Sequence, residues 1–218
     1  VAGSATTAGV ITLTLGAGTL TTGTPQAAGS ITVSTTQDFA SSAAASQPLG
    51  GQATIGTTLT LVDADKVGNK VTSGAVSVVF TAVNAIPSGG TITVTTPSNY
   101  FASRSGSAAP GSSIVCSTAC SGASMSNVSY TGNRVEVVVG GDGTTASAIT
   151  LTFGAGTFTT GTPQAAVSDG IKVSTTQDFA SSGTASAALG GHVTVGSYLA
   201  VFEQLCPQVG SSVFVAQY

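Results

Sequence analysis

The chain has 218 residues, of which 41% are hydrophobic and only 6% are charged, and its formal net charge is -3 at pH 7. Lysine and arginine do not cluster, which excludes the basic footprint of a nucleic-acid-binding protein. No apolar run approaches the ~18 residues that a membrane-spanning helix needs. Serine and threonine make up about three residues in ten. A surface so poor in charge suits glycan cover or burial in an assembly, so we expect an extracellular, cell-surface setting.

The predicted elements are short strands separated by turns. In chain order, apolar residues alternate with polar ones at Ile11–Leu15, Ile31–Val33, 53–62, Val76–Phe80, Ile92–Val94, Val135–Val139, Ile149–Phe153, Ile171–Val173 and Val193–Val195. This period predicts half-buried strands, and the Gly-, Pro- and Asn-rich segments between them predict turns. Residues 98–127 break the pattern and are predicted to be irregular. With no helical periodicity, the sequence predicts an all-β sandwich or barrel.

Two segments, residues 1–56 and 139–196, carry nearly the same sequence. Ile11-Thr-Leu-Thr-Leu15-Gly-Ala-Gly matches Ile149-Thr-Leu-Thr-Phe153-Gly-Ala-Gly, and Thr-Thr-Gln-Asp38-Phe39-Ala-Ser-Ser recurs around Asp178. The offset is about 138 residues, and about 140 after an insertion near Ser168. Such internal repetition decides the architecture. We predict a full unit at 57–196, made of an opening half (57–138) and a closing half (139–196), whereas residues 1–56 are a closing half alone.

The last segment, residues 197–218, resembles the start of another opening half. Gly196–Glu203 is similar to Gly56–Asp63, and Ser212–Ala216 is similar to Ser77–Phe80. We therefore predict three parts: a partial sandwich unit at 1–56, a full sandwich unit at 57–196 and a strand-forming tail at 197–218.

A half sandwich leaves an apolar face and unpaired strand edges, which is unfavourable in isolation. Either neighbouring chains complete each other by strand addition, or residues 1–56 pack on their own chain as a second sheet. A head-to-tail contact that does not close generates a filament. We expect a homopolymer, an extracellular filament or fibril, rather than a piece of a long tandem-repeat protein. The predicted contact residues are Ile11, Leu13, Leu15, Leu199, Val201, Val213 and Val215.

Three runs carry a family resemblance: Ser77–Phe80, Gly89–Pro97 and Ile149–Phe153. They resemble immunoglobulin-like repeats in large surface proteins of microbes and protists. The resemblance covers residues 57–196 and, by repetition, 1–56. It implies an immunoglobulin-like β-sandwich with an adhesive or structural role, although the buried Trp of antibody domains is lacking. The predicted strand exchange resembles the donor-strand complementation of bacterial pilins.

The alternative function is an adhesin module that binds carbohydrate or another surface. An exposed aromatic platform at Asn99-Tyr100-Phe101 would favour that function, and burial of these rings would favour a structural role.

Cys116 and Cys120 form either a small disulfide loop or two metal ligands. No second Cys/His pair accompanies them, so we predict the disulfide, in an oxidising compartment. Cys206 is left buried, free or bonded to another chain.

Asn127-Val-Ser129 is a glycosylation sequon if a eukaryote makes the chain. The Thr24-Pro25 turn and its copy are possible O-glycan sites or simple turns.

The remaining polar residues give little indication of metal binding or catalysis. Asp63, Asp65 and Asn69 resemble part of a calcium loop, but the spacing lacks the distant Glu, so we predict a solvated turn and no metal site. The repeated Asp38 and Asp178 are predicted to cap or shape a turn. His192 is the only histidine, and the carboxylates show no paired spacing for acid–base work. We expect neither a cofactor nor an enzyme.

Overall fold

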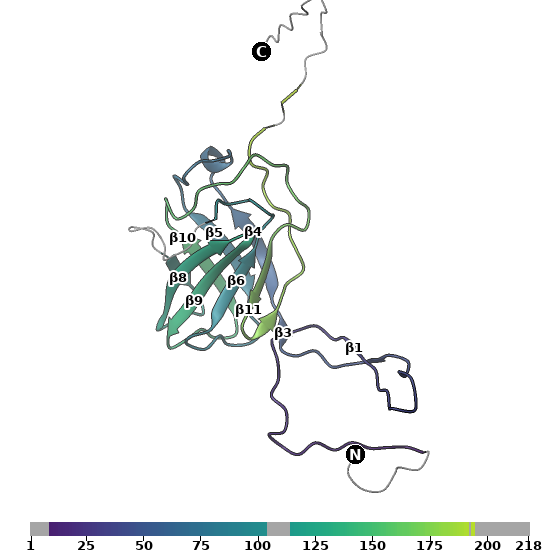
Figure 1. The fold of residues 1–218 in the computed structure, drawn as a ribbon. Helices are drawn as coiled ribbons and strands as arrows, with labels where there is room; N and C mark the ends of the chain where they lie inside the picture. Colours follow the sequence, from purple (N-terminus) through teal and green to yellow (C-terminus); the bar gives the residue numbers. More distant parts are fainter. Residues whose placement is uncertain (1–8, 104–113, 192, 195–218) are drawn as a thin grey trace, which may run out of the picture.

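The computed structural model describes residues 9–103, 114–191, 193 and 194. Two four-stranded antiparallel sheets pack face to face (Figure 1). The first has the order β4 (Thr54–Thr60), β5 (Val76–Thr81), β10 (Ala148–Phe153) and β7 (Ile114–Ser117). The second has the order β11 (Lys172–Thr175), β6 (Thr91–Thr95), β9 (Arg134–Gly141) and β8 (Ala123–Thr131). The predicted all-β sandwich is confirmed.

Helical structure in the described ranges is limited to one 3-10 turn, η1 (Asp63–Asp65). Within those same ranges, no helix has the length and apolar character needed to cross a membrane.

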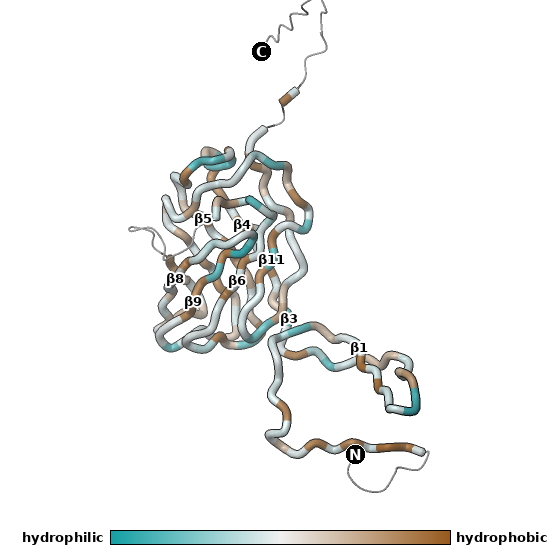
Figure 2. Tube along the Cα trace, viewed as in Figure 1, coloured by the Kyte–Doolittle hydropathy of each residue, from teal (hydrophilic) through white to brown (hydrophobic). Residues whose placement is uncertain are grey.

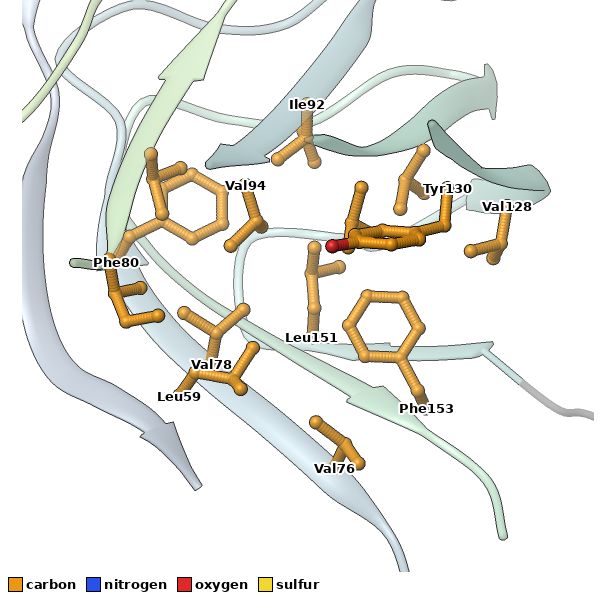
Figure 3. Packing of buried hydrophobic residues seen from close by; sticks show 14 of the residues in the cluster. Leu59, Val76, Val78, Phe80, Ile92, Val94, Val128, Tyr130, Leu151 and Phe153 are labelled. Carbon is orange, nitrogen blue, oxygen red and sulfur yellow. The ribbon is translucent and has the colours of Figure 1, made fainter. Parts of the chain in front are cut away.

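The core follows directly from the alternation in the sequence. On β5, Val76, Val78 and Phe80 are buried, while the residues between them face outward. On β10 the inward residues are Phe153, Leu151 and Ile149, which lie opposite these three β5 residues in register. Side chains from the second sheet, including Ile92 and Val94 of β6, fill the space between the sheets (Figure 3). Each such side chain contributes about 1.5–3 kcal/mol by leaving water.

The prediction of an irregular stretch over 98–127 is wrong in part, because β7 and the first residues of β8 lie inside it. Serine is frequent in these strands, and β7 is an edge strand whose residues are only half buried or exposed. Its main chain pairs with β10, and the half-buried Ile114 and Cys116 pack against the core. A run of four residues is too short for this alternation to stand out in the sequence.

Residues 9–50 form an extended segment, the N-terminal arm, that projects from one end of the sandwich (Figure 1). It holds one short strand pairing, β1 (Ser30–Ile31) with β2 (Ala44–Ala45), and one isolated bridge, Gln26 with Leu49. At its end, β3 (Gly51–Gln52) pairs in parallel with β12 (Asp178–Phe179) on the sandwich. The last described residues of the chain lie at the opposite end of the sandwich (Figure 1).

The strand predicted at Ile11–Leu15 does not form, although the same sequence forms β10 at Ile149–Phe153. A strand needs neighbours for its N–H and C=O groups. β10 lies between β5 and β7, whereas the copy in the arm has no neighbouring strand among the described residues. Over residues 9–50 the arm forms no sheet larger than the two-residue pairing of β1 with β2, whose residues are all exposed.

Candidate assembly site

The arm exposes the same apolar residues that the sandwich buries. Leu13 is 82% exposed, whereas its counterpart Leu151 is fully buried. The exposed large apolar side chains of the arm include Ile11, Leu13, Leu15, Leu20, Ile31, Val33 and Phe39. Their counterparts are Ile149, Leu151, Phe153, Phe158, Ile171 and Val173, all buried, and the half-buried Phe179. Figure 2 shows these apolar stretches along the arm, outside the sandwich. Exposed apolar side chains in such number along one segment are typical of an interaction surface.

The arm also keeps the hydrogen bonds of its buried copy. Gln26 and Leu49 exchange two main-chain bonds of 2.9 Å, and Gln164 and Leu189 exchange two of the same length. These local bonds of the sandwich segment therefore also form in the arm, where no packed sheets surround them.

One turn is reproduced most closely. The Thr35 hydroxyl accepts the N–H groups of Gln37 at 3.1 Å and Asp38 at 2.9 Å. In the sandwich, the Thr175 hydroxyl accepts those of Gln177 and Asp178 at 3.0 and 2.9 Å. Because its hydrogen bonds join residues two or three positions apart, the turn forms both on the exposed arm and inside the sandwich.

The two aspartates of this turn have different surroundings. Asp178 is fully buried, and its carboxylate accepts the N–H groups of Val83 at 3.1 Å and Asn84 at 3.2 Å. The Asn84 amide donates a further bond of 2.7 Å. Asp178 thus fixes the chain where it leaves β5. Asp38 is exposed, and the Thr35 hydroxyl donates to it at 2.9 Å.

The predicted contact residues divide into two groups. Ile11, Leu13 and Leu15 lie exposed on the arm. Leu199, Val201, Val213 and Val215 lie outside the described residues, as do His192 and Cys206. The prediction missed Leu20, Ile31, Val33 and Phe39, which the repeat itself could have supplied because each copies an apolar residue of the closing half.

The predicted disulfide and the predicted glycosylation sequon can be placed in the fold. Cys116 is bonded to Cys120, with their Cα atoms 5.9 Å apart, and the loop joins the end of β7 to the turn before β8. Asn127 lies within β8. No group of three or more His, Cys, Asp or Glu side chains that could hold a metal occurs in the part of the chain that the structure describes.

The calcium-like turn holds an internal ion pair instead. Asp65 is buried, and its carboxylate contacts the Lys70 ammonium at 2.9 Å. It also accepts N–H groups from Ser73 at 2.8 Å and Gly74 at 2.9 Å. Burial raises the pKa of Asp65, but these bonds outweigh it and hold the pKa well below its usual value.

The proposed aromatic platform is absent, because Tyr100 and Phe101 are buried. The Phe101 ring stacks on Phe158 with a centroid distance of 4.5 Å, and it meets Tyr130 edge-on. These rings belong to the buried core rather than facing solvent.

No protein-family model, curated protein or solved structure matches the chain.

Proposed function

We propose that the protein is structural: the protomer of an extracellular filament or fibril whose chains join head to tail. The arm of one chain completes an opening-type segment of the next chain by strand addition. The observation that carries this proposal is the contrast between Leu13, exposed on the arm, and Leu151, buried in the sandwich.

The energetics favour such a contact. Burying an exposed Leu, Ile or Phe side chain contributes about 1.5–3 kcal/mol, and the arm offers a row of them. Strand addition would also pair the main-chain groups of Ile11–Leu15, which lack a strand partner among the described residues. Because the arm already holds its local bonds, less ordering entropy opposes binding. A contact between two different surfaces propagates and gives an open filament.

The extracellular setting draws on two observations. Charged residues are only 6% of the chain, and Cys116 is joined to Cys120 by a disulfide that suits an oxidising compartment. The immunoglobulin-like character belongs to this proposal too, and the sandwich of two antiparallel sheets is compatible with it. The adhesin alternative gains no support from Tyr100 and Phe101, since both rings are buried.

The test compares the intact chain with two variants by light scattering and electron microscopy. One variant ends at Gly196, and the other carries Leu13→Lys in the full chain. We expect concentration-dependent growth into filaments by the intact chain alone. If the intact chain stays a compact monomer at every concentration, the proposal is wrong.

A further inference from the structure

A Gly-Gly junction follows each of the two repeated segments. Leu49–Gly51 ends the arm, and Leu189–Gly191 ends the closing half of the sandwich unit. Gly50 and Gly190 both adopt the left-handed backbone that favours glycine, with φ values of 76° and 81°. The leucine before each of them makes the same pair of 2.9 Å main-chain bonds to a glutamine. The two junctions therefore begin with the same local backbone.

The first junction has a docking partner in its own chain. Its strand β3 pairs in parallel with β12, and Gly51 lies opposite Asp178. The N–H of Ala53 donates to the Phe179 carbonyl at 3.1 Å, and Ala53 is fully buried. A Cβ at Gly51 would overlap the side chains of Val83 and Asp178, so the packing is close. The first junction thus docks on the turn that contains Asp178.

The second junction has no such partner among the described residues. A Cβ at Gly191 would meet nothing within 4 Å, and Val193, the counterpart of Ala53, is 94% exposed. Both residues border a hollow of about 220 Å³ that is also lined by Gly190 and Gln164. The buried Nε2 atom of Gln164 has no hydrogen-bond partner over the same described ranges. This end of the sandwich therefore presents a junction without its docking segment.

The arm carries a second copy of that docking segment. Asp38 and Phe39 repeat Asp178 and Phe179, and equivalent bonds to a threonine hydroxyl shape both turns. Asp38 is exposed, and Phe39 is 96% exposed. Neither residue belongs to a strand in the structure. The chain thus displays an unused junction and an unused docking turn.

We propose that the second junction, at Gly191 and Val193, docks on the Asp38–Phe39 turn of a second copy, as β3 docks on β12 within the chain. Gly191 then lies opposite Asp38, and the N–H of Val193 donates to the Phe39 carbonyl. This inference rests on the proposed function and names one of its contacts.

The layout of the chain favours a second copy over its own arm. The arm lies at the end of the sandwich where β3 is, whereas the last described residues lie at the opposite end (Figure 1). The β12 segment of the same chain is already paired with β3. Repetition of the contact places the second junction of each molecule on the arm of the next. That is the head-to-tail arrangement of an open filament.

Crosslinking tests the register of this contact. Two variants of the intact chain, both with Cys206→Ser, carry Gly191→Cys or Asp38→Cys and are mixed under mild oxidation. Paired strands lie about 4.8 Å apart, and disulfides join Cα atoms about 4.4–6.8 Å apart. We expect a mixed disulfide dimer, and little from the matched control in which the exposed Asp142→Cys replaces Asp38→Cys. Equal yields from both pairs, or none from the first, would overturn the register.

Blocking the second junction tests its role in assembly. Gly191→Val adds a side chain where the free molecule has room, so the unfolding curve of the monomer should not change. In the docked state this side chain would meet Asp38, as a Cβ at Gly51 would meet Asp178. We expect the critical concentration for assembly to rise about ten- to a hundredfold. Ser121→Val is the matched control, because it places the same side chain on an exposed turn before β8.

Assembly of the wild type distinguishes this contact from the proposed function. If the wild type assembles and Gly191→Val assembles equally well, the inference fails while the proposed function stands. If the wild type does not assemble, the proposed function fails, and the contact fails with it.

Discussion

The Lys70 ammonium lies 2.9 Å from Oδ1 of Asp65, a carboxylate that is only 1% exposed. The Ser73 hydroxyl donates to the same oxygen at 2.7 Å, and two N–H groups occupy the other. Together these bonds tie η1 to the chain that enters β5. A sequence that resembles part of a calcium loop thus forms a self-contained ionic turn.

Replacing Asp65 should make the sandwich less stable at neutral pH and less sensitive to acid. The bonds hold the folded pKa of Asp65 below the unfolded value of about 3.9. The contribution of ionised Asp65 to the free energy of unfolding is therefore complete above its unfolded pKa. That contribution is lost as the pH falls from the unfolded pKa toward the folded pKa. Asp65→Asn should lower the free energy of unfolding at pH 7 by about 3 kcal/mol, since it leaves Lys70 and the donors poorly paired.

Thermal unfolding followed by circular dichroism between pH 2 and pH 7 measures this. The wild-type and Asp65→Asn curves should converge in acid. The exposed Asp63→Asn variant is the control and should follow the wild type closely. Parallel curves for wild type and Asp65→Asn would contradict the assignment.

The two copies offer a matched pair of core substitutions. Leu151→Ala should cost about 2–5 kcal/mol of unfolding free energy, because it leaves a cavity between the sheets. Leu13→Ala removes the same atoms from the exposed arm and should leave the unfolding free energy of the monomer unchanged. Urea unfolding at concentrations below assembly distinguishes them. A comparable loss in Leu13→Ala would mean that the arm packs on its own sandwich.

Two glycines at corresponding positions should also differ. A Cβ at Gly161 would overlap the Asn99 carbonyl, whereas a Cβ at Gly23 meets nothing within 4 Å. Gly161 also donates its N–H to Tyr100 at 2.8 Å, so the backbone there has little freedom to move. Gly161→Ala should destabilise the fold by about 1–3 kcal/mol, as overpacking does, and Gly23→Ala should not. Equal melting temperatures for the two variants would be the contrary result.

Much of the sandwich could be predicted from the sequence. Strands buried on one face have apolar residues at every second position, and this period is visible in β5, β6, β9, β10 and β11. Edge strand β7 could not, since it has only four residues and none of them is fully buried. Ile11–Leu15 shows the opposite failure. Its alternation is as clear as that of β10. A strand forms only when a second segment pairs with it, however, and no such segment pairs with Ile11–Leu15 among the described residues.

The candidate site, too, could be predicted only in part. The repeat identified Asp38 and Asp178 as a recurring turn, because the bonds that build it are local to the sequence. The donors to Asp178, Val83 and Asn84, lie 95 and 94 residues away, and no sequence motif identifies them. Only the folded sandwich brings them together.

Asp178 provides the last prediction. Its carboxylate is fully buried and holds the two N–H groups that follow β5. Asp178→Asn keeps the shape but replaces a charged acceptor with a neutral amide that also brings donors into the site. We expect a loss of about 2–3 kcal/mol in the free energy of unfolding. Asp38→Asn makes the same change on the exposed arm and should leave the monomer's unfolding curve where it was. Chemical denaturation of both variants as monomers measures the difference, and an unaffected Asp178→Asn would show that the Val83–Asn84 connection holds without its carboxylate.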